Sequence, residues 1–395
     1  MLGSFIVVGC LTSVPPTAPR WQRAWQRRGV YEGRPDTVPL DVAAASLGVD
    51  PPWKAPRWAW RTAWRVGQQS MPLLHRWDGC RPTDTNVNLW VCWLKAIAGN
   101  QQQRRRWWQW RRDGNHGSDD GSDDDGLAYE LLPPVTRRVV ARPLASFYPP
   151  LHHQNVAMRT VFLDRAVEAE LSAALAASST AAAASAASAA SAASAAAASA
   201  TVVVLGSGFD VRALRLQSAA AHSAGWVEID LPHVTEQKAR MLARLALRRP
   251  ALATRVGALQ KLSANLSAPA ETTAALRTAL APLTAVTRAE SPRGSDAAHA
   301  GARRRTVIYV LEALLIYLPD AAALSLLRTC REEAVAAGAS HVTFCFADRL
   351  PMAGSALDDA STLLRQEAAL ELDGTSWLPK PGLARHMGIA RWSAP

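Results

Sequence analysis

The chain has 395 residues and a formal net charge of +11 at pH 7, and its uneven composition favours one large domain with additions over several average domains. Its five cysteines form no CxxC pair and follow no regular spacing, which argues against a disulfide framework or a zinc site and favours a reducing compartment, here the cytoplasm. No apolar run reaches the ~18 residues of a membrane-spanning helix, so we expect no membrane association.

The first 140 residues are rich in Trp and Arg and show no sustained helix or strand period. They end in the acidic, Gly-rich segment 114–126, which is typical of a flexible linker. We therefore predict an extension without stable structure over 1–140, followed by a folded domain over 141–395. The Arg/Trp cluster at 104–112 has the chemistry to stack on nucleic acid, and residues 1–30 lack acidic residues as organelle transit peptides do. Nucleic-acid binding and organelle targeting are thus two possible functions of the extension. The alternative is that it is a solvated segment without either function.

Apolar residues at helical spacing predict a helix over 156–171, with Arg159 on its remaining face. An Ala/Ser-rich insertion follows over 173–200. Alanine favours helix, but a uniform Ala/Ser surface offers little to pack, so we expect a tether or a fraying helix there.

Short apolar runs then alternate with helical ones. Strands are predicted at 201–205 (TVVVL), 226–230 (WVEID), 306–311 (TVIYVL) and 341–346 (HVTFCF), and helices at 232–249 and 319–337. Strand and helix in alternation predict βαβ units, and hence an α/β fold with a doubly wound, mostly parallel, Rossmann-like sheet.

Two features follow the first two strands, where ligands bind in such sheets. Gly206 and Gly208 form a GxG turn after the first strand, and Asp230 ends the second, where an acid can bind the hydroxyls of an adenosine ribose. Sites for nicotinamide dinucleotides have the motif G-x-G-x-x-G/A, in which the last residue is small. In this chain Val211 occupies that last position. S-adenosylmethionine carries no phosphate and tolerates this residue, so it is the favoured cofactor. A turn that binds nothing stays the alternative.

The segments VVVLGSGFDVRALRL, WVEIDLP with Lys238 downstream, and VIYVLEALLIYL occur in this order. Over about 148–346 the chain resembles the leucine carboxyl methyltransferases. The resemblance implies a class I methyltransferase fold and transfer of a methyl group from S-adenosylmethionine to a carboxylate. The best-known acceptor in the family is the C-terminal leucine of the type 2A protein phosphatase catalytic subunit. A sister branch modifies transfer RNA, and bacterial relatives act on small molecules.

The resemblance also implies roles for single residues. Gly206 and Gly208 would lie beside the methionine part of the cofactor, and Asp230 would bind its ribose. Glu312 would lie near the cofactor's amino group. Arg159 would hold a carboxylate, either on the cofactor or on the substrate.

Some positions depart from the family pattern. Asn265 and Leu266 stand where the family has the Asp-Leu pair that brackets the adenine. The family's Asn-Arg-Gly before the helix arginine is replaced here by 153–156, and its early lysine motif has no clear counterpart. Residues 347–395 do not resemble the substrate-recognising end of the phosphatase enzyme.

A carboxylate acceptor is already an anion at neutral pH, so the chemistry needs positioning and exclusion of water and no general base. We therefore expect no catalytic His, Cys or Ser and no metal. The favoured function is methylation of a protein C-terminal carboxylate. The alternatives are a carboxyl methyltransferase of transfer RNA or of a small acid, and a non-catalytic relative.

Overall fold

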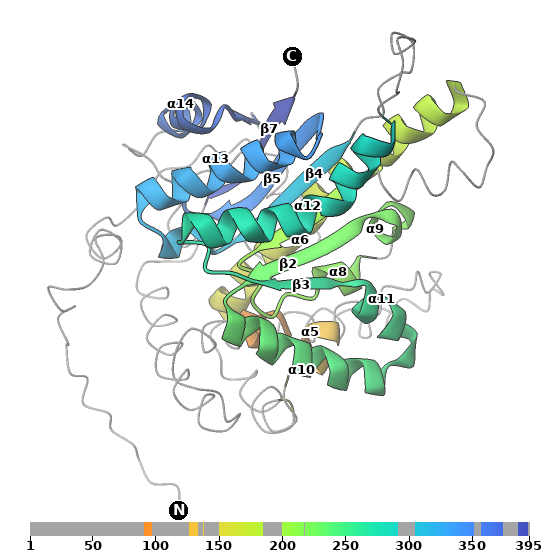
Figure 1. Ribbon diagram of the computed structural model, residues 1–395. Coiled ribbons are helices and arrows are strands. Elements are labelled where there is room, and N and C mark those ends of the chain that lie inside the picture. Colours follow the sequence, from red (N-terminus) through yellow and green to blue (C-terminus); the bar gives the residue numbers. More distant parts are fainter. Residues whose placement is uncertain are drawn as a thin grey trace, which may run out of the picture.

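The computed structural model describes residues 91–96, 126–132, 137, 150–184, 200–216, 218–290, 305–350, 357–373 and 386–393. In Figure 1 these residues form the coloured ribbon around one twisted sheet.

Within the described residues, seven strands form this sheet in the order β3-β2-β1-β4-β5-β7-β6. The strands are β1 (Ala200–Leu205), β2 (Gly225–Asp230), β3 (Gln260–Ser263), β4 (Thr306–Glu312), β5 (His341–Asp348), β6 (Glu371–Leu372) and β7 (His386–Ser393). Strands β1 to β5 are parallel to one another, whereas β7 runs antiparallel to β5 and to β6. The predicted doubly wound, mostly parallel sheet is thus confirmed.

Helices cover both faces of the sheet (Figure 1). They are α5 (Leu127–Leu131), α6 (Pro150–Ala184), α8 (Arg212–Arg215), α9 (Ala219–Ser223), α10 (Pro232–Arg248), α11 (Ala253–Ala258), α12 (Pro269–Glu290), α13 (Asp320–Ala336) and α14 (Leu357–Ala368), with 3-10 turns η5 (Pro250–Leu252) and η6 (Leu315–Tyr317). Val202 and Val204 of β1 pack with α6, α9 and α10, whereas Val203 and Leu205 pack with α12 and α13. Because successive strand residues point to opposite faces, a strand covered on both faces must be apolar throughout.

The central strands are anchored at Tyr309 of β4, which is fully buried. Its ring stacks on Phe344 of β5 with the ring centroids 4.9 Å apart, and its hydroxyl donates to the carbonyl of Cys330 in α13 at 2.7 Å. Burial raises the pKa of Tyr309 well above 10.0, so this hydroxyl keeps its proton and the hydrogen bond at any physiological pH.

The strand β7 lies in the C-terminal segment in which the sequence showed no familiar pattern. Arg391 of β7 bonds to Glu170 of α6 through Nε at 3.1 Å and Nη2 at 2.6 Å, and to Asp373 through Nη1 at 2.5 Å. Thr343 of β5 donates to the other oxygen of Glu170 at 2.9 Å. Side chains from distant parts of the chain therefore fasten this strand into the sheet.

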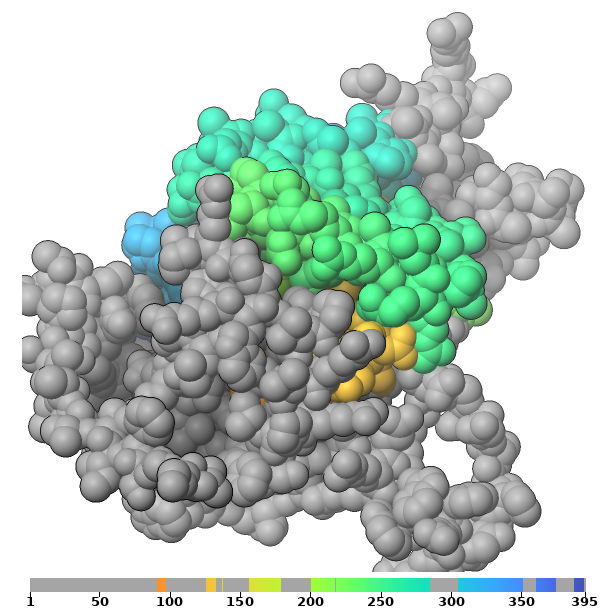
Figure 2. Space-filling view, turned by 90° about the horizontal axis from the view of Figure 1, so that it is seen from below, coloured from red at the N-terminus to blue at the C-terminus, as the bar shows by residue number. Residues whose placement is uncertain are grey.

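Two segments of the predicted N-terminal extension belong to the main core. Trp93, Leu94 and Leu131 are buried and pack in the same cluster as α6 and α10. Figure 2 shows the gold atoms of α5 against the green atoms of α10, and Glu130 pairs with Arg249 there. Helix α6 also continues to Ala184, inside the predicted insertion, with Ala174 and Ser178 of that part buried. Described residues of the predicted extension and of the predicted insertion therefore pack in the same core as the predicted domain.

The Arg/Trp cluster at 104–112, the residues 1–30 and the segment 185–199 lie outside the described residues. Among the described helices, none has the length and apolar character needed to cross a bilayer.

Candidate functional site

A pocket of about 250 Å³ opens at the carboxyl ends of β1, β2, β3 and β4. It is lined by Gly206, Asp230, Leu231, Val234, Ala264, Asn265, Leu266, Ser267, Ala313, Leu314, Tyr317 and Leu318. Most of these side chains are apolar, and Asp230 is the one carboxylate in this lining. The volume is close to the lower end for ligand pockets, about 300 Å³.

The floor of the pocket is the turn after β1. Gly206 and Gly208 have φ angles of 61° and 47°, a region that favours glycine. The Gly208 N–H donates to Asp230 Oδ2 at 2.6 Å, and the Leu231 N–H donates to Oδ1 at 2.7 Å. Burial raises the pKa of Asp230, and these two backbone donors oppose the rise. A carboxylate has about four acceptor positions, so Asp230 keeps capacity for two ligand hydroxyls.

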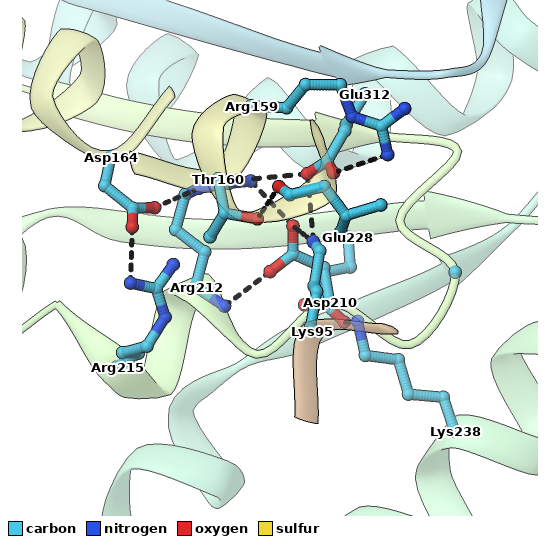
Figure 3. A network of polar contacts seen from close by, with 12 residues as sticks. Lys95, Arg159, Thr160, Asp164, Asp210, Arg212, Arg215, Glu228, Lys238 and Glu312 are labelled. Atoms are coloured by element: carbon cyan, nitrogen blue, oxygen red, sulfur yellow. Dashed lines mark hydrogen bonds and ion pairs between the residues drawn. The ribbon is translucent and has the colours of Figure 1, made fainter. Parts of the chain in front are cut away.

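Beside this turn lies a group of buried charges, here called the ion cluster (Figure 3). It consists of Lys95, Arg159, Asp164, Asp210, Arg212, Arg215 and Glu312. The side chains come from the helical segment 91–96, helices α6 and α8, the loop after β1, and the end of β4. Glu312 directly precedes Ala313, which lines the pocket, so the ion cluster adjoins the pocket.

Glu312 is the carboxylate with the most cationic partners in the ion cluster. It lies 2.9 Å from Lys95 Nζ, 3.4 Å from Arg159 Nη2 and 3.2 Å from Arg212 Nη2. Burial alone would raise the pKa of Glu312, but these three cations lower it to about 2. Glu312 is therefore an anion throughout the physiological range.

The ion cluster carries more positive than negative charge. Two Lys or Arg side chains lie before the β1 loop (Lys95, Arg159) and two lie after it (Arg212, Arg215), against three carboxylates, so its formal charge is +4 − 3 = +1. Its members are at most 15% exposed, so water screens this excess poorly. A buried positive excess favours an anionic ligand.

A buried carboxylate outside the pocket, that of Asp348, holds the part of the pocket wall that follows β4. Asp348, at the end of β5, is fully buried and accepts the backbone N–H groups of Leu314, Leu315 and Ile316 at 2.5, 2.7 and 3.1 Å. This fixes the turn η6 and, with it, the strained Ala313 at φ 62°.

The structure brings the sequence-predicted site residues to one edge of the sheet, in two groups. Gly206, Asp230, Asn265 and Leu266 line the pocket, and Gly208 bonds to Asp230. Asn265, the residue that we expected beside the adenine, accepts hydrogen bonds at Oδ1 from the backbone N–H and the hydroxyl of Ser267. Its side-chain oxygen is therefore hydrogen-bonded within its own loop.

The other two predicted residues, Arg159 and Glu312, are neighbours in the ion cluster. Sequence reasoning missed the other five members of this cluster, Lys95, Asp164, Asp210, Arg212 and Arg215. For Arg212, its position two residues after Asp210 was a usable signal, because the two side chains bond at 2.7 Å. The sequence around Lys95 contained no such signal, because its partners Asp210 and Glu312 lie 115 and 217 residues further along the chain.

A mostly parallel sheet of this order, with a glycine turn after β1 and an acid at the end of β2, is the fold of class I S-adenosylmethionine-dependent methyltransferases. The sequence matches the leucine carboxyl methyltransferase family over residues 116–331, more than half of the chain. The chain therefore belongs to this family, whose cofactor is S-adenosylmethionine.

Solved structures similar to the chain include an O-methyltransferase from neocarzinostatin biosynthesis, in complex with S-adenosyl-L-homocysteine and 1,4-dihydroxy-2-naphthoic acid. The two sequences are 18% identical, the TM-score is 0.27, and the match covers 50% of each chain. The match thus spans half the length of that protein. Another is the mitomycin 7-O-methyltransferase, with 18% identity, a TM-score of 0.27, and 70% of this chain and 79% of that chain covered. A search of curated proteins gave no match.

The residues of the site fit the cofactor of the family. S-adenosylmethionine has an adenosine part and a zwitterionic amino acid part. The pocket offers apolar walls and the Asp230 carboxylate for the first, and the ion cluster offers buried groups of both signs for the second.

We expect Gly206→Ala to weaken binding of S-adenosylhomocysteine about tenfold and to lower the free energy of unfolding by ~1–2 kcal/mol. A Cβ at Gly206 would lie 2.9 Å from Leu314 Cδ1, and Leu314 lines the pocket, so the side chain must move into the ligand space. Calorimetric titration and urea unfolding measure the two effects. The control is Gly257→Ala in helix α11, where no described atom lies within 4 Å, and which should stabilise by ~0.5–1 kcal/mol. Wild-type affinity in Gly206→Ala would contradict the prediction.

We expect Glu312→Gln to lower the free energy of unfolding near pH 7, by an amount that shrinks as the pH falls. The pKa of Glu312 is about 2 in the folded protein, against 4.5 normally, so its ionised form stabilises the fold above 4.5 and this stabilisation is lost as the pH falls towards 2. The shift corresponds to about 3 kcal/mol. Urea unfolding from about pH 7 to about pH 3 tests it.

The control for this series is Glu371→Gln. Arg365 also lowers the pKa of Glu371, but both side chains are exposed, so we expect a nearly pH-independent, small effect. A gap between wild type and Glu312→Gln that stays constant with pH would show that Glu312 is not held as an anion by its cations.

Proposed function

We propose that this protein forms a methyl ester on a carboxylate, and that the acceptor is the C-terminal leucine of a protein. The observation that carries the proposal is the buried ion cluster with its positive excess, next to a nucleoside-sized pocket, in a chain of the leucine carboxyl methyltransferase family. The catalytic subunit of type 2A protein phosphatase is the first acceptor to test.

In this proposal, three parts of the site hold S-adenosylmethionine. Asp230 accepts from the ribose hydroxyls, and Leu231 and Leu266 contact the adenine. Glu312 accepts from the ammonium group, while Arg159 and Lys95 bind the carboxylate of the amino acid part. Each of these residues lines the pocket or contacts another in the ion cluster.

The cofactor supplies the methyl group, bonded to a positively charged sulfur. A chain-terminal carboxyl group has a pKa of ~3.5, so it arrives as an anion and needs no base. The work left to the protein is to align the acceptor oxygen with the methyl group and to exclude water from the pair. The carbon–oxygen bond forms as the carbon–sulfur bond breaks, giving a methyl ester and S-adenosylhomocysteine.

The experiment is to incubate the full chain with S-adenosylmethionine labelled in the methyl group and the type 2A phosphatase catalytic subunit or a peptide with its C-terminus. We expect label that is released as methanol by mild base, because esters hydrolyse there and methyl amines and ethers do not. The matched control is the same peptide with a C-terminal amide, which should take up no label.

Equal labelling of the acid and the amide, or label that resists base, would contradict carboxyl methylation. Base-labile label on transfer RNA or on a small acid, and none on the peptide, would keep the ester chemistry and replace the acceptor. No label on any acceptor, with cofactor bound, would favour a non-catalytic relative.

A further inference from the structure

Arg212 pairs with three carboxylates of the ion cluster, more than any of its other cations in the described contacts (Figure 3). It lies in helix α8 and is 1% exposed. Its Nε donates to Asp164 Oδ1 at 2.8 Å, its Nη1 to Asp210 Oδ2 at 2.7 Å, and its Nη2 to Glu312 Oε2 at 3.2 Å. All three nitrogens of the guanidinium group are thus used, each on a different carboxylate.

The three carboxylates belong to three separate elements. Asp164 is on helix α6, Asp210 is in the loop after β1, and Glu312 ends β4. A guanidinium group is planar and presents its donors in a rigid fork, so it fixes the relative positions of the groups that it binds. Arg212 therefore sets where Glu312 lies relative to the glycine turn and to α6.

Arg215, one turn further along α8, provides a comparison within the same helix. It also pairs with Asp164, through the other carboxylate oxygen, but the described contacts include no bond from it to Asp210 or Glu312. Both arginines thus fasten α8 to α6, and Arg212 alone of the two reaches the groups beside the pocket.

We propose that Arg212 is a positioning residue of the cofactor site, which holds Glu312 and the Asp210 loop in the arrangement that binds the amino acid part of S-adenosylmethionine. The proposal rests on the proposed function in so far as the site takes this cofactor. It assigns to Arg212 a role through Glu312 and Asp210, without contact to the ligand.

The charges around Glu312 give this role a pH signature. Lys95, Arg159, Arg212 and Asp210 face Glu312 from four elements; burial and Asp210 raise the pKa of Glu312, and the three cations lower it. Removal of Arg212 takes away one of these cations, so the pKa of Glu312 rises. Since the ammonium group of the cofactor needs an ionised acceptor, the affinity of the variant should fall as the pH is lowered, whereas the wild type keeps Glu312 ionised.

The experiment titrates the full chain with S-adenosylhomocysteine in a calorimeter at about pH 8 and about pH 5.5, together with urea unfolding. The variants are Arg212→Met, Arg212→Lys and, as the matched control, Arg215→Met. We expect Arg212→Met to lose about 100-fold in affinity at the higher pH and more at the lower pH, whereas the affinity of the wild type stays nearly constant. Arg215→Met removes one positive charge of the ion cluster but no contact to Glu312 or Asp210, so it should lose about tenfold or less at both pH values, although its unfolding midpoint falls as well.

The Arg212→Lys variant keeps the charge but loses the fork, so we expect an intermediate loss of affinity with little added pH dependence. If Arg212→Met does not fold, Arg212→Lys decides: wild-type affinity at both pH values overturns the proposal. Equal losses in Arg212→Met and Arg215→Met would also overturn it, since both would then act only by fastening α8. A wild type that binds no S-adenosylhomocysteine would instead contradict the cofactor of the site.

Discussion

The Asp230→Ala variant is expected to lose S-adenosylhomocysteine binding by about 100-fold or more. Asp230 both lines the pocket and accepts the backbone N–H groups of Gly208 and Leu231. The substitution removes the acceptor for the ribose hydroxyls, at ~1.5–3 kcal/mol for each hydrogen bond to a charged group, and frees the glycine turn. Calorimetric titration of the full chain measures the loss.

Two further variants separate the carboxylate from the backbone around it. Asp230→Asn keeps the size of the side chain and one acceptor oxygen, so we expect a loss of about tenfold. Thr235→Ala removes a hydroxyl that donates to the backbone carbonyl of Asp230 at 3.3 Å and should change affinity less than about threefold. Binding by a folded Asp230→Ala protein with wild-type affinity would refute the ribose role of this residue.

The Asp348→Ala variant is expected to lower the free energy of unfolding by about 4 kcal/mol or more. The buried Asp348 carboxylate accepts hydrogen bonds from four backbone N–H groups, those of Leu314, Leu315 and Ile316 at the start of η6 and that of Arg349 at 2.7 Å. Alanine would leave these donors without their acceptor, and each buried orphan costs ~1–3 kcal/mol. Urea unfolding followed by circular dichroism measures the change.

Asp320→Ala is the control for this substitution. Asp320 is 57% exposed and lies 3.8 Å from Arg349, so its loss should cost less than about 0.5 kcal/mol. Asp348→Asn should fall between the two, because the amide keeps one acceptor oxygen. Equal stability of Asp348→Ala and Asp320→Ala would mean that the η6 turn does not depend on this carboxylate.

The strands that sequence reasoning found are those buried on both faces. TVVVL and TVIYVL are apolar and β-branched throughout because helices cover both sides of β1 and β4. The strand β3 (QKLS) was missed because it lies at the edge of the sheet and is mostly polar. The strand β7 was missed because Gly388 and Arg391 interrupt its apolar pattern, and tertiary contacts hold it.

Some residues of the site could likewise be predicted from the sequence, and others could not. Gly206, Gly208 and Asp230 were predictable because the carboxyl ends of adjacent parallel strands meet at one edge of the sheet. Lys95 and Asp164 were not, since their roles depend on which helix faces pack against that edge. The family resemblance supplied Arg159 and Glu312, and the structure adds that they pair with each other at 3.4 Å.

The place of β7 in the sheet has a consequence for synthesis on the ribosome. The strand inserts between β5 and β6, and Arg391 pairs with Glu170, 221 residues earlier in the chain. Until residues 386–393 have emerged, β5 presents an unpaired edge, which is a site for association between nascent chains. Closing so long a loop late also slows folding. We therefore expect the nascent chain to need protection by chaperones until β7 is in place.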